Sequence, residues 1–372
     1  MEKKEMRVSA TERLYSLDAL RGLDMIILVG GASLIVSLVQ LTGIEAEGLR
    51  VTLKEHVDWV GFHIHDLIFP LFMFVSGVAI PYSIQSKLEK KVPKNDLILK
   101  TFKRMVILII LGIFYNGGFR TGLAHARIAS VLGQIGIAYF FATLITMHTT
   151  TIRSRLIWLV SILAGVGIIQ LFIPVPGVGA GVLTPEGCIN GYIDRHLLIG
   201  KLHEDIFDPE GILSNISAIG ITLMGAISGS VLRSQKWTNY KKLGVLTVAG
   251  ILSIGIALLL SPYYPVIKKC WTSTFNLLAG GTSVLLLAFF YLVIDHWKIR
   301  GWTFPFRLYG MNALFVYLLF HFISVGDLNK DILGWIARSL GEYGNLFNQF
   351  SKLGLICLLL YYMYKKRIFL RA

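Results

Sequence analysis

The stretch from His56 to Gly77 contains the side chains of this sequence that are best suited to chemistry. It opens with three histidines and two aspartates within eleven residues, and then becomes an apolar run that contains Pro70. Imidazole takes up and releases protons near neutral pH, and it can itself be acylated as a nucleophile. Ionisable groups at the edge of an apolar segment are costly to keep there, so they indicate a candidate functional site.

His56 and Asp66 are the main candidates in this stretch. His56 is either a general base or nucleophile, or an ordinary solvated loop histidine. Asp66 directly precedes LIFPLF, so its carboxylate must be paired, neutral or in a wet cavity. It is expected either to orient His56 or to hold two helices together through an ion pair. His63 and His65 lack further ligands of matching spacing, so no metal is expected.

The composition indicates the kind of scaffold that must position these groups. The chain has 372 residues, of which 54% are hydrophobic and 16% charged, and its mean hydropathy is +0.65. Soluble domains are about 25% charged, so the long apolar segments predict a multi-pass membrane protein. The net charge of +14 is attributed to Lys and Arg in the loops on one side of the membrane rather than to nucleic-acid binding.

The hydropathy pattern predicts an all-α membrane bundle of about ten to eleven transmembrane helices in a single domain, 1–372. The longest break, 174–212, is expected to form an external loop, and 326–350 is expected to lie at the interface without spanning. The predicted spans are 25–41, 66–84, 105–119, 128–147, 156–173, 212–232, 243–260, 271–294, 306–325 and 353–364.

The distribution of positive charge predicts the orientation of this bundle. Most of the 36 Lys and Arg residues fall in the termini and in every second loop. The positive-inside rule therefore places the N-terminus in the cytoplasm and His56 and Arg127 on the outer side. The sequence contains no P-loop, GxGxxG, HExxH or GxSxG motif, which argues against ATP-driven transport, Rossmann redox chemistry, zinc peptidases and α/β-hydrolases.

Basic side chains at the predicted cytoplasmic ends of spans form a second candidate site. Guanidinium groups bind phosphates in a bidentate manner, so these residues suit a phosphorylated cofactor; each of them also fits the topology rule alone. The residues of this predicted cationic mouth are Arg21, Lys103, Arg104 and Arg307.

Further polar residues lie within or beside the predicted spans. Arg127 and Gln134 stand at the start of the fourth span, and Asn312 and His321 lie in the ninth. Polar groups inside a membrane need partners. These four residues are therefore expected either to line a tunnel or to connect neighbouring helices.

The chain resembles the heparan-α-glucosaminide N-acetyltransferase family and its bacterial relatives, within the wider group of membrane acyltransferases. The resemblance runs over nearly the whole chain, as a series of blocks in the family's order. The blocks are RLYSLDALRG, HVDWVGFHIHDLIFPLFMFVSG, RIASVLGQIGIAYF, GYIDRHLL, DPEGILSNISAIGITLMGAISG and FPFRLYGMNALFVYLLFH. One departure is VGGAS at 29–33, which keeps the family's glycines but lacks its asparagine.

This resemblance implies a reaction that crosses the membrane. Acetyl would pass from cytoplasmic acetyl-CoA to the amine of a glucosamine-like sugar or glycan on the outer side, in a bacterial cytoplasmic membrane and in a homodimer. His56 would be the general base or acetyl carrier, and Asp66 or Asn312 would steady the imidazole or the oxyanion. The acetyl-CoA would be bound by the cationic mouth and by the residues that match polar positions of the family, which are Arg127, Gln134 and His321.

Two alternative functions remain open at this point. The same chemistry with a hydroxyl acceptor would make the protein an O-acetyltransferase of a surface or cell-wall polysaccharide. The protein could also be an amino-sugar transporter. The absence of an inverted repeat in the sequence argues modestly against transport, although glycine and proline do interrupt the second span.

Overall fold

The computed structural model describes residues 14–118, 122 and 125–370, and this part of the chain is all-α. It is 74% helical and contains no strand. The predicted helical membrane bundle is therefore confirmed. The expected extension of the third span to residue 119 lies outside the described residues.

Eight helical segments of the described chain are long and apolar enough to cross a membrane, or nine if a bent pair counts as one span. The eight are α1 with η1 and α2 (Tyr15–Gln40), α4 with η2 and α5 (Ile64–Glu89), α8 (Val131–His148), α9 (Ile152–Phe172), α11 (Ile212–Arg233), α12 (Asn239–Leu260), α13 with η3 (Ser273–His296), and η5 with α17 (Gly341–Lys365). These segments coincide with eight of the ten predicted spans.

The other two predicted spans explain why this count is below the expected ten to eleven. Helix α6 (Lys94–Tyr115) is long enough, but Lys100, Lys103 and Arg104 interrupt its apolar character. The ninth predicted span is broken at Asn312 into α14 (Phe304–Met311) and α15 (Ala313–Phe322). Helix α15 then meets α16 (Val325–Ser339) at a bend of 77°, and these two helices form the bent pair.

Small residues allow the central helices to approach closely. A Cβ atom at Gly77 of α4 would lie 2.0 Å from the carbonyl oxygen of Thr222, and one at Gly225 of α11 would lie 2.0 Å from that of Phe74. Gly225 and Gly229 form a GxxxG pair, which is a common device for close packing of membrane helices. This crossing fixes α4, the helix that begins beside His56, in the centre of the bundle.

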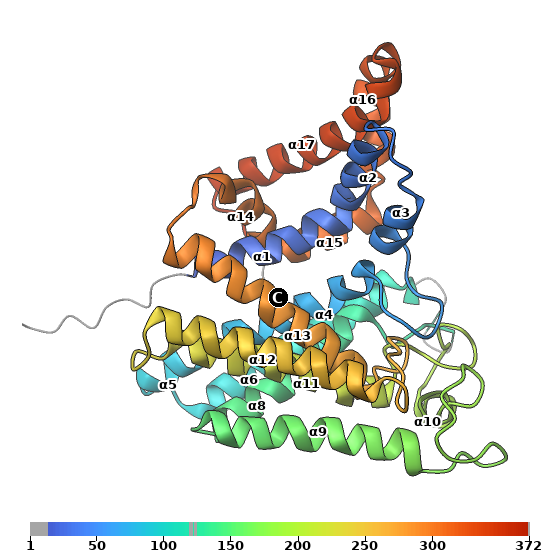
Figure 1. Cartoon of the computed structure of the whole chain (residues 1–372), viewed down its shortest axis with the longest axis vertical. Helices are drawn as coiled ribbons and strands as arrows, with labels where there is room; N and C mark the ends of the chain where they lie inside the picture. The colour runs from blue at the N-terminus through green and yellow to red at the C-terminus, as the bar shows by residue number, and fades with distance from the viewer. Residues whose placement is uncertain (1–13, 119–121, 123–124, 371–372) are drawn as a thin grey trace, which may run out of the picture.

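The helices form two layers in Figure 1. Helices α1, α2, α14, α15 and α17 lie together on one side, and α4, α6, α8, α9, α11, α12 and α13 form the larger bundle. Glycines again allow the contact between α1 and α14, because a Cβ atom at Gly22 would lie 1.7 Å from the carbonyl oxygen of Phe306. The first and last parts of the chain therefore pack as one unit.

Most helices run roughly along one direction, so the bundle has two ends (Figure 1). The end that carries α3 (Glu47–Lys54), α10 (Ile189–Leu197) and the loop 261–272 is called the His56 end. The end that carries the start of α1, α5 (Ser86–Glu89) and the start of α14 is called the Arg307 end. The predicted external loop, 174–212, lies at the His56 end and contains α10.

Candidate active site at one end of the bundle

The start of α4 brings His56 and Asp66 together. Asp66 is the third residue of this helix, and its Oδ2 accepts a hydrogen bond of 3.0 Å from the backbone N–H of His63, the N-cap residue. A carboxylate at this position stabilises a helix start. Its Oδ1 lies 2.7 Å from Nδ1 of His56. Asp66 is 1% exposed and the His56 side chain 54% exposed, so a buried carboxylate orients an accessible imidazole.

This arrangement is chemically suited to a histidine that acts as a base. When Nδ1 carries the proton, it donates to Asp66, and the lone pair of Nε2 is free for a substrate proton. The same carboxylate stabilises the positive charge that the ring gains when it takes that proton. Asp66 makes both kinds of contact that were expected for it, one with His56 and an ion pair of 3.1 Å with Lys268, and it also begins α4.

Lys268 completes this group, although the sequence did not single it out. Its Nζ lies 2.9 Å from Nδ1 of His56 and 3.1 Å from Oδ1 of Asp66. Burial lowers the pKa of Lys268, and the charge of Asp66 opposes that shift. No local signal marks a lysine that is 202 positions from its carboxylate partner in a short loop. Only the packing of the loop 261–272 against the start of α4 brings it here.

Two more histidines border the site and are held by backbone carbonyl groups. Nδ1 of His65 lies 3.1 Å from the carbonyl oxygen of Leu53, and Nδ1 of His63 lies 3.0 Å from that of Glu55. The ring of His65 lies 4.5 Å from that of His56. In the part of the chain that the structure describes, no group of three or more His, Cys, Asp or Glu side chains is arranged to hold a metal ion.

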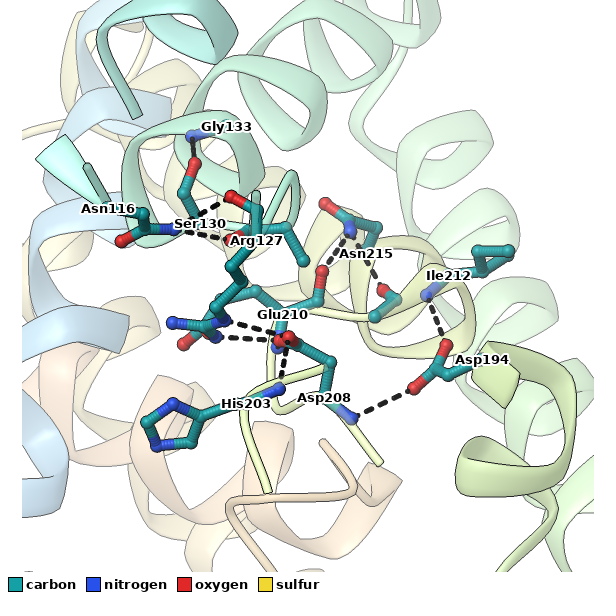
Figure 2. Close-up of polar contacts among 12 residues, drawn as sticks. Asn116, Arg127, Ser130, Gly133, Asp194, His203, Asp208, Glu210, Ile212 and Asn215 are labelled. Carbon is teal, nitrogen blue, oxygen red and sulfur yellow. Dashed lines mark hydrogen bonds and ion pairs between the residues drawn. The ribbon is translucent and has the colours of Figure 1, made fainter. Parts of the chain in front are cut away.

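A second charged cluster at the same end is formed by Arg127, Asp208 and Glu210 (Figure 2). Nε and Nη2 of Arg127 donate to the two carboxylate oxygens of Asp208, at 2.8 and 2.7 Å. Nη2 also donates to Glu210. Burial acts against the charge of Arg127, but the two carboxylates outweigh it and raise its pKa. Arg127, which was expected to bind a cofactor, is engaged by these two acids.

Asp194 holds the loop of this cluster at the start of α11. Its carboxylate accepts hydrogen bonds from the backbone N–H groups of Ile212 and Asp208, at 3.0 and 3.3 Å (Figure 2). It lies so close to Gly211 that a Cβ atom there would be 2.1 Å from a carboxylate oxygen. Burial raises the pKa of Asp194 to about 6. The turn DPEG before α11 is the one signal in the sequence for this cluster.

Glu210 carries the excess negative charge of the cluster, because Asp208 already forms the bidentate pair with Arg127. Burial raises the pKa of Glu210 to about 7; Arg127 opposes this shift, and Asp208 adds to it. A carboxyl group with such a pKa changes its charge near neutral pH.

The residues of the predicted cationic mouth are not near His56. The guanidinium of Arg307 lies 4.3 Å from the centre of the Tyr15 ring at the Arg307 end, and that of Arg104 lies 4.4 Å from the Tyr139 ring. Nε of each is buried and has no hydrogen-bond partner among the described residues. Arg21 lies 3.9 Å from Asp18, and Lys103 is exposed on α6.

The remaining predicted residues lie apart from one another. Both amide atoms of Gln134 are buried without a hydrogen-bond partner in the described chain. The ring of His321 stacks on that of Tyr115 at 3.6 Å. Asn312 does not contact His56, because its amide donates to the carbonyl oxygen of Ile368 and accepts from the N–H of Leu370, at 3.3 and 3.1 Å. The C-terminal segment therefore takes up the side chain that was expected to steady the imidazole.

Comparison with known proteins adds to this geometry. Heparan-alpha-glucosaminide N-acetyltransferase from Mus musculus is 26% identical over 426 aligned residues, which cover 98% of this chain and 61% of the relative. The protein of that name from Homo sapiens is 28% identical over 363 residues, which cover 82% of this chain and 52% of the relative. The chain is similar to these acetyltransferases over most of its length. The family resemblance seen in the sequence blocks is therefore confirmed.

The chain spans about half to three fifths of the length of these acetyltransferases. In addition, residues 13–172 match a family described as "Domain of unknown function (DUF5009)". This matched segment contains His56, Asp66 and Arg127, whereas Glu210 and Lys268 lie beyond it. The candidate site therefore combines the segment that matches this family with later parts of the chain.

Proposed function

We propose that this chain is a membrane acetyltransferase that moves acetyl from acetyl-CoA to the amine of an amino sugar at the His56 end. The observation that carries the proposal is the 2.7 Å contact between the accessible imidazole of His56 and the buried carboxylate of Asp66. The similarity to enzymes named for acetylation of a glucosaminide supports both the reaction and the class of acceptor.

In the proposed reaction, Nε2 of His56 accepts a proton from the attacking amine. The amine nitrogen forms a bond to the carbonyl carbon of the thioester, the C–S bond breaks, and the thiol leaves with the proton that His56 returns. Asp66 orients the ring and stabilises its positive charge in between. In a variant of this route, Nε2 itself carries the acetyl group before the amine attacks.

The Arg307 end suits the nucleotide part of the donor. Arg307 and Arg104 lie on aromatic rings, and their buried Nε groups have no hydrogen-bond partner in the described part of the chain. Arg300 lies 4.4 Å from the same Tyr15 ring as Arg307. Guanidinium groups of this kind suit phosphates. With the N-terminus in the cytoplasm, an elongated acetyl-CoA along the helices would enter from the cytoplasm and present its thioester towards His56. The acceptor would then be outside.

The test is acetyl transfer to glucosamine by the purified protein in detergent, with release of the CoA thiol and formation of N-acetylglucosamine measured together. We expect His56→Ala to lower the rate by about 10²- to 10⁴-fold, as for loss of a general base. His148, an exposed histidine at the end of α8, provides the control, and His148→Ala should transfer acetyl at the wild-type rate. A wild-type protein that does not bind acetyl-CoA would refute the proposal.

The two routes are separated by single-turnover labelling. Acetyl-CoA with a labelled acetyl group is mixed with the protein without acceptor, and the protein is quenched and digested. Label on His56 that disappears in His56→Ala would establish the acetyl-histidine route. A protein that transfers acetyl but retains no label would establish direct attack by the amine.

A further inference from the structure

Three polar atoms meet on the inner side of the His56 ring. Nδ1 of His56, Oδ1 of Asp66 and Nζ of Lys268 are separated by 2.7, 2.9 and 3.1 Å, so each lies within hydrogen-bond distance of the other two. Nε2 lies on the opposite side of the ring, where an acceptor amine would approach. Lys268 therefore contacts the ring at Nδ1, on the side away from Nε2 and the reacting atoms.

These three contacts cannot all be favourable at once. A carboxylate only accepts hydrogen bonds and an ammonium only donates them, whereas Nδ1 of a neutral imidazole does one or the other. If Nδ1 carries the proton, it donates to Asp66 and opposes the ammonium of Lys268. If Nδ1 is bare, it accepts from Lys268 and opposes the carboxylate. The two neighbours thus demand opposite tautomers of His56.

The tautomer decides whether His56 can act as a base. With the proton on Nδ1, the lone pair of Nε2 is free to take a proton from an acceptor. With Nδ1 bare, the neutral ring carries its proton on Nε2 and cannot take another one there. The group that Nδ1 contacts therefore determines whether His56 is an active or an inactive base.

The backbone around Lys268 is held by hydrogen bonds and by packing. The carbonyl oxygen of Val266 accepts a 2.9 Å hydrogen bond from Gly61, and the N–H of Ile267 donates to Oγ1 of Thr272 at 3.1 Å. Trp271 is 1% exposed and has a φ of 48°, a conformation that bulky residues rarely adopt. Packing that over-determines a strained residue is common beside functional sites.

We propose that Lys268 is a positioning residue that selects which nitrogen of His56 carries the proton. When its ammonium donates to Nδ1, the ring is held inactive; when it donates to Asp66 alone, Nδ1–H turns to Asp66 and Nε2 becomes the base. The effect of this choice on acetyl transfer rests on the proposed function, but the choice itself does not. In an acetyltransferase, such a device limits activation of water when no acceptor is bound.

Most of the other charged groups near the ring have contacts of their own. On the side of α3, Glu55 pairs with Arg50, and Lys54 ends the helix; on α4, His63 and His65 contact carbonyl oxygens. From the loop, Lys269 pairs with Glu204 at 2.7 Å. Glu210 acts electrostatically on Lys268 and favours its charged form. Nδ1 of His56 contacts Lys268 and Asp66.

The direct test measures the reactivity of Nε2 without any acetyl-CoA. Diethyl pyrocarbonate reacts with an unprotonated imidazole nitrogen, and the modified residue is identified by mass spectrometry of peptides. At pH 8, where free imidazole is neutral, we expect Lys268→Met to increase the rate at His56 by about threefold or more, because Asp66 is then the only partner of Nδ1. His148 of the same sample serves as the internal reference. An unchanged or lower rate would refute the proposal.

Two further variants separate selection of the tautomer from a general effect of charge. Lys268→Arg keeps a donor and should label near the wild-type rate. Lys269→Met removes the neighbouring charge, which is directed at Glu204, and should also label at the wild-type rate. If Lys268→Met does not fold, Lys268→Gln takes its place, since an amide can either donate or accept and no longer forces Nδ1 to be bare. An increase in Lys269→Met equal to that in Lys268→Met would refute selection.

Activity measurements distinguish this inference from the proposed function. In Lys268→Met, hydrolysis of acetyl-CoA without acceptor should rise relative to acetyl transfer. Faster labelling in a protein that transfers no acetyl would keep the inference and remove the proposed function. Acetyl transfer that depends on His56, without any change in labelling, would keep the function and remove the inference.

Discussion

The basic side chains at the two ends of the bundle have different contacts. At the His56 end, Arg127 and Lys268 contact the buried carboxylates of Asp208 and Asp66. At the Arg307 end, Arg307 lies on an aromatic ring, and Arg104 does so along α6, and neither meets a carboxylate within the described residues. Other arginines at the Arg307 end do contact carboxylates, namely Arg233 with Glu89 at 2.6 Å and Arg300 with Asp295 at 3.7 Å.

This difference separates cations that are held by carboxylates from guanidinium groups that lie on aromatic rings. A cation that is held by a buried carboxylate already donates hydrogen bonds to it, so it orients its neighbours and stabilises the fold. A guanidinium on an aromatic face is held in place while its N–H groups stay available for an anion. The comparison therefore supports the proposal that the His56 end positions the reacting groups and that the Arg307 end binds an anionic donor.

Removal of Arg127 is expected to have the largest effect on the stability of the His56 end. Arg127→Met leaves the carboxylates of Asp208 and Glu210 buried without their cation, which typically costs about 3–5 kcal/mol. We expect a large fall in the thermal unfolding midpoint of the detergent-purified protein. Arg50→Met, which removes an exposed ion-pair partner at the same end, should leave the midpoint unchanged. Equal midpoints for Arg127→Met and the wild type would show that this cluster does not support the fold.

The titration of Glu210 should make the stability of the protein depend on pH. Its pKa is raised to about 7, so the folded protein binds this proton more tightly than the unfolded chain does. Stability is then fully present at low pH and falls as the pH rises from about 4 to 7, by about 3 kcal/mol. Unfolding measured from pH 5 to 8 should show this fall, and Glu210→Gln should largely remove it.

A smaller slope should remain in Glu210→Gln, because the pKa of Asp194 is raised to about 6 and acts in the same direction. If the variant and the wild type lose stability equally between pH 5 and 8, Glu210 is not the group that carries the excess charge.

Removal of Arg307 should have the smallest effect on the fold and a specific effect on the donor. Arg307→Met removes no carboxylate pair of the described chain, so we expect a near wild-type unfolding midpoint. Binding of acetyl-CoA, measured by calorimetry, should weaken by about tenfold, which corresponds to the loss of one charge-assisted contact. Arg153→Met removes an exposed charge at the start of α9 and should bind normally. Equal affinity in both variants would refute a donor site at Arg307.

Short-range information in the sequence was sufficient for much of this protein. Long apolar segments cannot be solvated, so they become helices in a membrane whatever their neighbours are, and eight of the predicted spans are found at their expected places. His56 and Asp66 are ten positions apart, and the start of α4 between them brings them into contact. Charge and breaks within a segment, as in α6 and at Asn312, account for the two spans that differ.

Only the tertiary structure decided which distant groups complete the site. Lys268 reaches Asp66 from 202 positions away, and Arg127 meets Asp208 across 81 positions. The side chain of Asn312 is bound by the C-terminal segment rather than placed beside His56. The physical reason is that hydropathy depends on each segment alone, whereas the pairing of buried charges depends on which helix ends the packing brings together.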